Sequence, residues 1–351
     1  MEKQARWTEL DGNQRRIFVD TAQLHQAYVE AFAKSRSYRG GMYWKKATGR
    51  EYLFRSVDRR GYGRSLGARS AQTEETHREF HENKKQCVET LHHLRARLKE
   101  QARFCKAARI ARVPKVVGSI LRLLEQHKLL GNNLQVIGTN ALYAYEAAAG
   151  IVLESGLMAT QDVDILWDVR SKLQLNVPAQ MEPGGFLAIL QAADRSFELI
   201  RKRSFRAVNR DGYMVDLVKA EPRPAHAPER RAMGNEGKDL VAAEIRNLQW
   251  LLSSPKFTHH VICEDGFPAL MSAPDPRAFA LHKLWLSHQP DREPLKRKRD
   301  KEQSLAVCMI VLHHMPHLGF TPAELRMFPK SVVAAAARTL KDNGLPPGYT
   351  A

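Results

Sequence analysis

The chain has 351 residues, 55 Lys and Arg against 38 Asp and Glu, and a hydrophobic fraction of 43%. This composition excludes a disordered chain, and the length predicts two or three domains that each bury a core. The four Cys residues are scattered without CxxC spacing, which is typical of reduced thiols and predicts a cytoplasmic protein. Polar residues interrupt the apolar stretch 136–153 and the first residues carry no apolar segment, so we expect neither a membrane span nor a signal peptide.

Positive charge is concentrated in the first third of the chain. Residues 1–112 contain 25 Lys and Arg and 13 Asp and Glu, a net charge of +12, and the rest of the chain supplies only +5. A field of this kind is typical of proteins that bind RNA or DNA. A solvated, helix-rich surface gives the same composition, so both interpretations stay open.

The elements of this first third alternate between helix and strand. Helical periodicity without Gly or Pro predicts a helix over 14–34, and residues 42–55 predict a β-hairpin with aromatic side chains. Residues 58–70 resemble a loop rich in Arg and Gly. Residues 73–113 contain no Gly or Pro and predict a long helix capped by Thr73, whose apolar seam needs the first helix as a partner.

The hairpin combines rings with cations. Its aromatic residues are Tyr43, Trp44, Tyr52 and Phe54, and its basic residues are Lys45, Lys46, Arg50 and Arg55. Rings stack on bases and cations neutralise phosphates, which are the two parts of a single-stranded nucleic-acid site. We therefore predict contact with RNA, tRNA included, through Lys45, Lys46, Arg59 and Arg60. The alternative is that the aromatic residues pack against the long helix and the cations are solvated.

The remainder mixes strands and helices. We expect strands at 134–137, 162–167, 204–209, 213–218, 257–263 and 267–271, and helices at 115–130, 138–149, 247–253, 276–287, 293–314 and 330–343. The fold class is therefore α+β. The predicted domains are a basic helical domain with an inserted hairpin over 1–112, a core over 113–220, a linker rich in Pro and Gly over 221–238, and a largely helical C-terminal region over 239–351.

The strongest local signal is an acidic pair on the strand predicted at 162–167. Asp162 and Asp164 are two residues apart and project from one face of the strand, while their apolar neighbours enter the core. Two carboxylates this close repel each other unless a cation lies between them, and Mg²⁺ or Mn²⁺ prefers oxygen ligands. Asp216, on the strand predicted at 213–218, offers a third carboxylate. An acidic pair by itself is also typical of a solvated strand edge.

A second signal precedes the acidic pair. Gly138 and Thr139 join a predicted strand to a predicted helix, and such a turn lets backbone N–H groups approach a phosphate. The turn and the three carboxylates are the parts that two-metal phosphoryl transfer requires: Asp162 and Asp164 bridge the metal ions, and Asp216 completes the metal site or activates the attacking hydroxyl. The sequence contains neither GxxxxGK nor GxSxG, which disfavours a P-loop NTPase and an α/β-hydrolase.

At these residues the sequence resembles the nucleotidyltransferase fold of the DNA polymerase β superfamily, in which a Gly-Gly or Gly-Ser turn precedes an h-D-h-D-h strand and a separate strand Asp. It is most similar to bacterial stand-alone nucleotidyltransferase-like proteins, which also share the regions around 38–45, 65–70 and 276–283. Thr139 departs from the usual Gly or Ser, and 22 residues separate it from Asp162. This longer spacing occurs in relatives of the AbiEii type of toxin.

The resemblance implies a mixed sheet with flanking helices and, from the toxin relatives, places Lys283 and Asp300 beside the nucleotide. A Lys there neutralises triphosphate charge as a point cation. Without the resemblance, Lys283 would be assigned to an exposed helical surface.

The resemblance also implies a function. It predicts a Mg²⁺-dependent enzyme that moves an NMP from an NTP to RNA or tRNA, to a protein, or to a small molecule such as an aminoglycoside, and it admits a role as a toxin-like module. The alternative is a catalytically inactive fold that binds a nucleotide or nucleic acid. The intact set of three Asp favours the enzyme, because an inactive protein has no reason to keep three carboxylates that repel one another.

Overall fold

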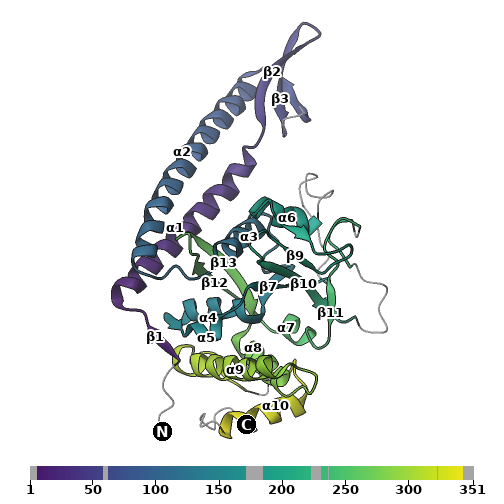
Figure 1. Cartoon of the computed structure of the whole chain (residues 1–351). Helices are drawn as coiled ribbons and strands as arrows, with labels where there is room; N and C mark the ends of the chain where they lie inside the picture. Colours follow the sequence, from purple (N-terminus) through teal and green to yellow (C-terminus); the bar gives the residue numbers. More distant parts are fainter. Residues whose placement is uncertain are drawn as a thin grey trace. The chain divides into compact units, whose positions relative to one another are not determined.

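The computed structural model describes residues 6–57, 62–170, 185–222, 231–235, 237–321 and 323–342. The chain forms two compact units (Figure 1). One contains residues 16–110, and the other contains residues 1–15 together with 111–351. They differ in architecture and are described in turn.

Two long helices, α1 (Gly12–Ser37) and α2 (Ala71–Ala107), form the frame of the unit of residues 16–110. The hydroxyl of Ser70 accepts a hydrogen bond from the amide of Thr73, and the hydroxyl of Thr73 accepts one from the amide of Ser70. Ser70 is therefore the cap of α2 and Thr73 is its partner in a capping box, which corrects the predicted start. The helix also ends before the predicted residue 113, because Arg109 adopts a left-handed backbone with φ 57°.

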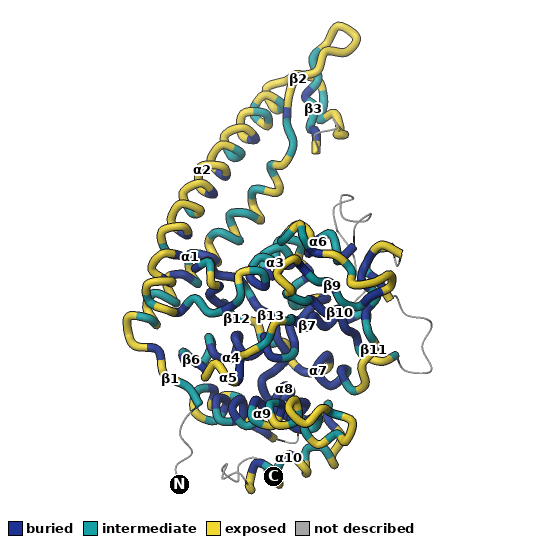
Figure 2. Tube along the Cα trace, viewed as in Figure 1, coloured by how far each residue is buried: buried dark blue, intermediate teal, exposed yellow. Residues whose placement is uncertain are grey.

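The two helices pack against each other in opposite directions. The Thr21 hydroxyl and the Cys105 thiol are 3.2 Å apart, and the Arg95 guanidinium approaches the Tyr28 hydroxyl at 3.4 Å. Early positions of α1 thus meet late positions of α2, as the seam of α2 predicts. The buried residues of α2 are Phe80, Cys87, Leu91, Leu98, Ala102 and Cys105, and those of α1 are Thr21 and His25 (Figure 2).

A three-stranded antiparallel sheet links α1 to α2. It contains β2 (Gly41–Ala47), β3 (Arg50–Ser56) and β4 (Gly63–Ala68). Thr48 and Gly49, with φ of 48° and 75°, form the turn between β2 and β3, and positive φ at both positions matches the twist of a two-residue hairpin. The hairpin is as predicted, whereas β4 replaces part of the expected loop because its backbone pairs with β3.

The larger unit is organised around a six-stranded mixed sheet. Its strands are β5 (Leu134–Ile137), β7 (Asp162–Trp167), β8 (Glu198–Leu199), β9 (Arg206–Val208), β10 (Met214–Ala220) and β11 (Ala243–Ile245). Their order is β5-β7-β10-β9-β8, and β11 pairs with the end of β10. The pairings of β10 with β7 and β11 are parallel, and the others are antiparallel. The central strands β7 and β10 are therefore fixed side by side.

Smaller sheets and helices surround these strands. β1 (Trp7–Glu9) pairs with β6 (Ile151–Leu153), and β12 (Lys256–Ile262) pairs with β13 (Pro268–Pro274). The helices are α3 (Lys115–Gln126), α4 (Leu142–Ala149), α5 (Ser155–Met158), α6 (Gly185–Ala193), α7 (Gln249–Ser253), α8 (Pro276–Ser287), α9 (Pro294–His314) and α10 (Lys330–Asp342), and a short 3₁₀ helix, η1 (Gly138–Ala141), precedes α4.

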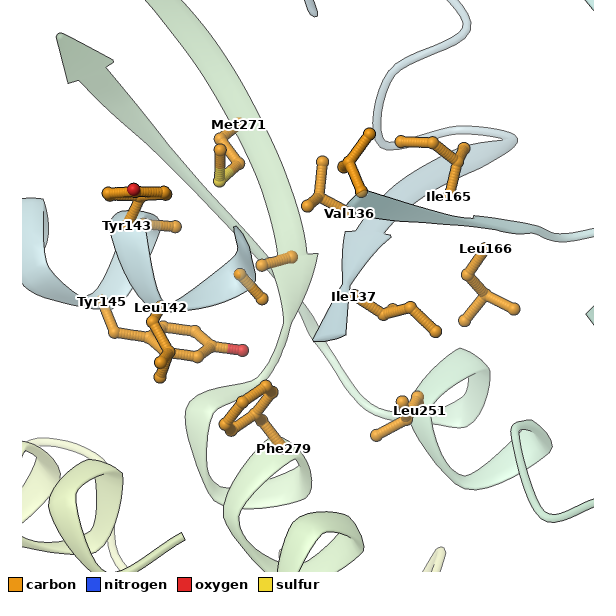
Figure 3. Packing of buried hydrophobic residues seen from close by; sticks show 14 of the residues in the cluster. Val136, Ile137, Leu142, Tyr143, Tyr145, Ile165, Leu166, Leu251, Met271 and Phe279 are labelled. Atoms are coloured by element: carbon orange, nitrogen blue, oxygen red, sulfur yellow. The ribbon is translucent and has the colours of Figure 1, made fainter. Parts of the chain in front are cut away.

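The core of this unit joins the sheet to the C-terminal helices. Figure 3 shows Ile137 of β5 and Leu142 and Tyr145 of α4 around Phe279 of α8. The buried Tyr145 hydroxyl donates a 2.8 Å hydrogen bond to the carbonyl of Pro274, just before α8 begins. The same core holds β5, α4 and α8 together, and β5 is one of the two strands that pair with the acidic strand β7.

The α+β class and the mixed sheet with flanking helices are confirmed. Among the described residues, no helix is both long enough and apolar enough to cross a membrane. The predicted boundaries between a core, a linker and a C-terminal region inside the larger unit stay predictions, and residues 223–230 and 236 of the linker lie outside the described residues.

Candidate active site

Three carboxylates come together on the two central strands. Asp162 and Asp164 are two residues apart on β7, so they lie on one side of the sheet. Asp216 on β10 is the direct partner of Asp164 in the parallel register. Residues paired in this way have their side chains next to each other on the same face of a sheet, and the predicted set is therefore brought together.

The electrostatics of Asp164 show that the carboxylates influence one another. Burial, followed by the negative charges of Asp162 and Asp216, raises the pKa of Asp164 to about 6. The positive charges of Lys283 and Arg206 oppose this rise but do not cancel it. The nearby positive charges therefore do not fully balance the charge of ionised Asp164, and the site favours a further cation next to it.

Arg206 holds the third carboxylate. It lies on β9 opposite Asp216, and its Nε and Nη2 each donate a 2.6 Å hydrogen bond, one to each carboxylate oxygen of Asp216. This forked geometry is the strongest that Arg and a carboxylate form, and Asp216 is only 5% exposed. The pKa of Arg206 is raised, first by Asp216 and further by Asp162 and Asp164. Sequence reasoning missed Arg206, because nothing in the local pattern indicates which strand pairs with β10.

The turn at Gly138 lies directly against Asp164. Gly138 has φ 66°, and a β-carbon built there would be 2.3 Å from Oδ2 of Asp164. Gly is therefore required for two reasons, the left-handed backbone and the close approach of a carboxylate. Ile137, just before the turn, pairs with Asp164 in the antiparallel register of β5 with β7. The predicted turn and the predicted acidic strand are direct neighbours.

Polar side chains fix the residues around this turn. Thr139 is buried, and its hydroxyl accepts a 3.2 Å hydrogen bond from Gln303 of α9, which also donates 2.7 Å to the carbonyl of Leu157. The Asn140 amide donates 2.6 Å to the backbone carbonyl of Asp162. Gln303 and Asn140 thus hold the turn against α9 and β7, and neither carries a sequence signal that singles it out.

Lys283 and Asp300 form a buried ion pair. The Nζ of Lys283 on α8 donates a 2.7 Å hydrogen bond to Asp300 on α9, and Arg292 donates 2.9 Å to the other oxygen of Asp300. Asp300 is fully buried and Lys283 is 6% exposed, so Lys283 does not belong to an exposed helical surface. Burial lowers the pKa of Lys283, although Asp300 and Asp164 act in the opposite direction. The predicted pair lies together, and Lys283 is close enough to Asp164 to affect its pKa.

The donor set fits a hard divalent cation. Asp162 and Asp164 offer oxygen ligands, and the raised pKa of Asp164 reflects negative charge that a metal ion would neutralise. Among the described residues, no group of three His, Cys, Asp or Glu side chains is arranged to hold a metal ion as it stands. Both carboxylate oxygens of Asp216 accept hydrogen bonds from Arg206.

The predicted nucleic-acid residues lie in the other unit. Lys45 and Lys46 are exposed on β2. Arg59 and Arg60 lie outside the described residues. Their role stays a prediction.

Comparison with known proteins agrees with the geometry of the larger unit. A family model described as "Nucleotidyltransferase" matches residues 115–327, which is more than half of the chain and includes Gly138, the three Asp and the Lys283–Asp300 pair. No curated protein and no solved structure matches the chain.

Proposed function

Because the chain belongs to the nucleotidyltransferase family, we propose that it is an active, Mg²⁺- or Mn²⁺-dependent enzyme that transfers an NMP from an NTP to an acceptor hydroxyl. In this reaction a bond forms between the acceptor oxygen and the α-phosphorus, the bond from that phosphorus to the β-phosphate oxygen breaks, and pyrophosphate leaves. One observation carries the proposal. Three carboxylates meet on β7 and β10 beside the Gly138 turn, and the pKa of Asp164 is raised to about 6.

The three carboxylates have different roles in this proposal. Asp162 and Asp164 hold the metal ions, which when bound neutralise phosphate charge and orient the NTP. Asp216 joins the metal site or accepts the proton of the attacking hydroxyl. Its hydrogen bonds to Arg206 hold it in position until the substrates bind.

The nucleotide is held from two sides. We assign the phosphates to the turn at Gly138 and Thr139, whose backbone N–H groups would donate to phosphate oxygens. The absence of a side chain at residue 138 lets this turn lie directly against Asp164. From α8, Lys283 contributes positive charge, and Asp300 fixes its position. Thr139 contributes its backbone N–H, and its hydroxyl accepts a hydrogen bond from Gln303.

The acceptor decides the biological role, which ranges from RNA or tRNA modification to protein modification, resistance to a small molecule, or a toxin-like activity. The test is to incubate the full chain with each α-³²P-labelled NTP, Mg²⁺ and total cellular RNA, and then to separate RNA, protein and small molecules. Label should enter one fraction, and Asp164→Asn should abolish it. Asp211→Asn, on an exposed residue close to β10 in sequence, is the matched control and should keep full activity. Label that survives Asp164→Asn would refute the site.

A second candidate is a protein that binds a nucleotide without turnover. The Arg206–Asp216 fork favours it, because a carboxylate already neutralised by Arg needs no metal ion. Calorimetric titration with each NTP and Mg²⁺ separates the two candidates. Binding without transfer to any fraction would select the inactive protein.

A further inference from the structure

The sheet of β2, β3 and β4 has two different faces. On one face, the buried Met42 and Leu53 pack against Phe80 of α2. Trp44 lies on the same face, 5.7 Å from the ring of His77, and the Arg55 guanidinium lies 4.5 Å from the Phe80 ring. Trp44 and Arg55, one ring and one cation of the predicted hairpin, therefore attach the sheet to α2.

The other face carries the remaining rings. Tyr43 is opposite Phe54, and Lys45 is opposite Tyr52, so alternation places all four on one side of the sheet. The Tyr43 and Phe54 rings are 5.6 Å apart, and the Lys45 ammonium lies 5.5 Å from the Phe54 centroid. Tyr43 is 44% exposed, although aromatic residues of this size are usually covered. These four residues are called the outer face below.

Charge gathers around this sheet more than anywhere else in its unit. Residues 16–110 contain 21 Lys and Arg and 10 Asp and Glu, and residues 34–69 alone contain 11 of these cations and only two of the acids. A net charge of +9 thus belongs to the segment that ends α1 and forms the sheet, whereas the rest of the unit is nearly neutral. A concentrated positive field favours a polyanion as the partner.

Several of these cations are available to a partner. Lys45, Lys46 and Arg50 are exposed, and none of them forms an ion pair with another described residue. Alternation places Lys45 and Arg50 on the outer face and Lys46 on the opposite one. Arg69 differs, because it donates hydrogen bonds to both Glu51 and Glu74. It also lies 5.0 Å from the Trp44 ring, on the face of the sheet that packs against α2. The cations at the edge of the outer face are thus distinct from those that stabilise the fold.

We propose that the outer face binds single-stranded RNA, with bases stacked on Tyr43, Tyr52 and Phe54 and phosphates contacted by Lys45 and Arg50. Every base has a π-face, so a row of rings binds a strand without strict sequence preference. RNA is favoured over DNA because unpaired bases are common in RNA loops and ends, whereas cellular DNA is mostly paired. This inference concerns binding and does not depend on NMP transfer.

The stacking part is tested with the full chain and a fluorescein-labelled oligouridylate of about 15 nucleotides, near the upper end of site sizes for such surfaces. Tyr43→Leu keeps an apolar side chain but removes the ring, and it should weaken binding by roughly fivefold to a hundredfold, as measured by anisotropy. Tyr43→Phe should retain wild-type affinity. Phe104→Leu is the matched control, because Phe104 is a 50% exposed ring of the same unit near the far end of α2, and it should change nothing.

The charge part is tested by salt dependence. The double variant Lys45→Gln/Arg50→Gln should reduce the slope of log affinity against log salt by about 0.7 for each phosphate that it no longer neutralises. Arg97→Gln/Lys99→Gln removes the same charge from α2, away from the sheet, and should leave the slope unchanged.

The outcomes are distinct from those of the NMP-transfer assay. Equal losses in Tyr43→Leu and Phe104→Leu, or no binding of oligouridylate at low salt, would overturn the RNA site. Tighter binding of the matching single-stranded oligothymidylate would overturn the choice of RNA. Calorimetric binding of ATP with Mg²⁺, measured on the same variants, should stay at the wild-type level throughout. A failure of the proposed NMP transfer would appear in the labelling assay and not in the anisotropy.

Discussion

Asp164 on β7 and Asp216 on β10 are direct partners in a parallel register, so two acidic side chains lie next to each other on one face of the central sheet. Like charges placed opposite each other destabilise a sheet. Here the two carboxylates differ. The charge of Asp216 is balanced by Arg206, whereas the repulsion shows at Asp164 as a raised pKa.

Replacing Asp164 by Asn should abolish NMP transfer and raise stability in the absence of metal. Because the pKa of Asp164 is about 6 in the fold, against about 4 in an unfolded chain, the native state binds more protons between these values. The contribution of Asp164 to wild-type stability should therefore fall as pH rises from 4 to 6 and stay low above it. Asp164→Asn should remove this fall and gain about 2 kcal/mol at pH 8, as measured by urea unfolding with EDTA. A variant that is less stable than wild type at pH 8 would contradict the repulsion.

Removing Arg206 should free Asp216 for a metal ion. Arg206→Gln leaves the buried Asp216 without its fork and should cost about 2 kcal/mol of stability, less than for a fully buried pair because Arg206 is partly exposed. In exchange, the Mg²⁺ concentration for half-maximal ATP binding should fall. Arg210→Gln, on a strongly exposed residue of the turn before β10, is the control and should alter neither quantity. An unchanged Mg²⁺ requirement in Arg206→Gln would mean that Arg206 and the metal ion do not compete.

Gly138→Ala adds only one methyl group, yet it should lower stability and abolish ATP binding at the site. The new β-carbon would meet Oδ2 of Asp164 and would also sit in a left-handed backbone. Gly212→Ala separates the two effects, because Gly212 has φ 79° but nothing within 4 Å of a β-carbon. We expect Gly212→Ala to cost about 1 kcal/mol and to leave ATP binding intact. Gly138→Ala should cost more and abolish Mg²⁺-dependent ATP binding, and equal effects of the two substitutions would show that the turn is merely structural.

A double-mutant cycle separates the two roles of Lys283. Lys283→Met leaves the fully buried Asp300 with Arg292 alone and should cost about 3 kcal/mol. Adding Asp300→Asn should recover much of this stability. If Lys283 contacts the nucleotide, the double variant should remain weak in ATP titrations despite its restored stability. Full recovery of ATP binding would assign Lys283 to the fold alone.

The sequence predicted elements with strong local patterns. Pro residues flank α8 at both ends, and the apolar seam of α2 indicated its need for a partner. Short elements such as β8 and β11 were missed, because two or three residues carry no periodicity and form only when a neighbouring strand pairs with them. α1 was located correctly, but its buried positions are Thr21 and His25, polar residues that an apolar pattern passes over.

The same distinction holds for the site. Asp162 and Asp164 are two residues apart on a predicted strand, and Gly138 lies between a predicted strand and a predicted helix. These local patterns indicated all three residues. Arg206 and Gln303 act through pairings between β9 and β10 and between α9 and η1, which no local pattern encodes.

All four thiols are buried, Cys87 and Cys105 in one unit and Cys263 and Cys308 in the other. Burial raises the pKa of Cys263 and Cys308 to about 12 and raises that of Cys105 as well, so little reactive thiolate is present in the folded chain. Alkylation by iodoacetamide must therefore wait until a unit opens. Each unit therefore contains two thiols whose alkylation rate reports how often that unit opens. Comparing the labelling rates of the two Cys pairs by peptide mapping would show whether the units unfold together or one before the other.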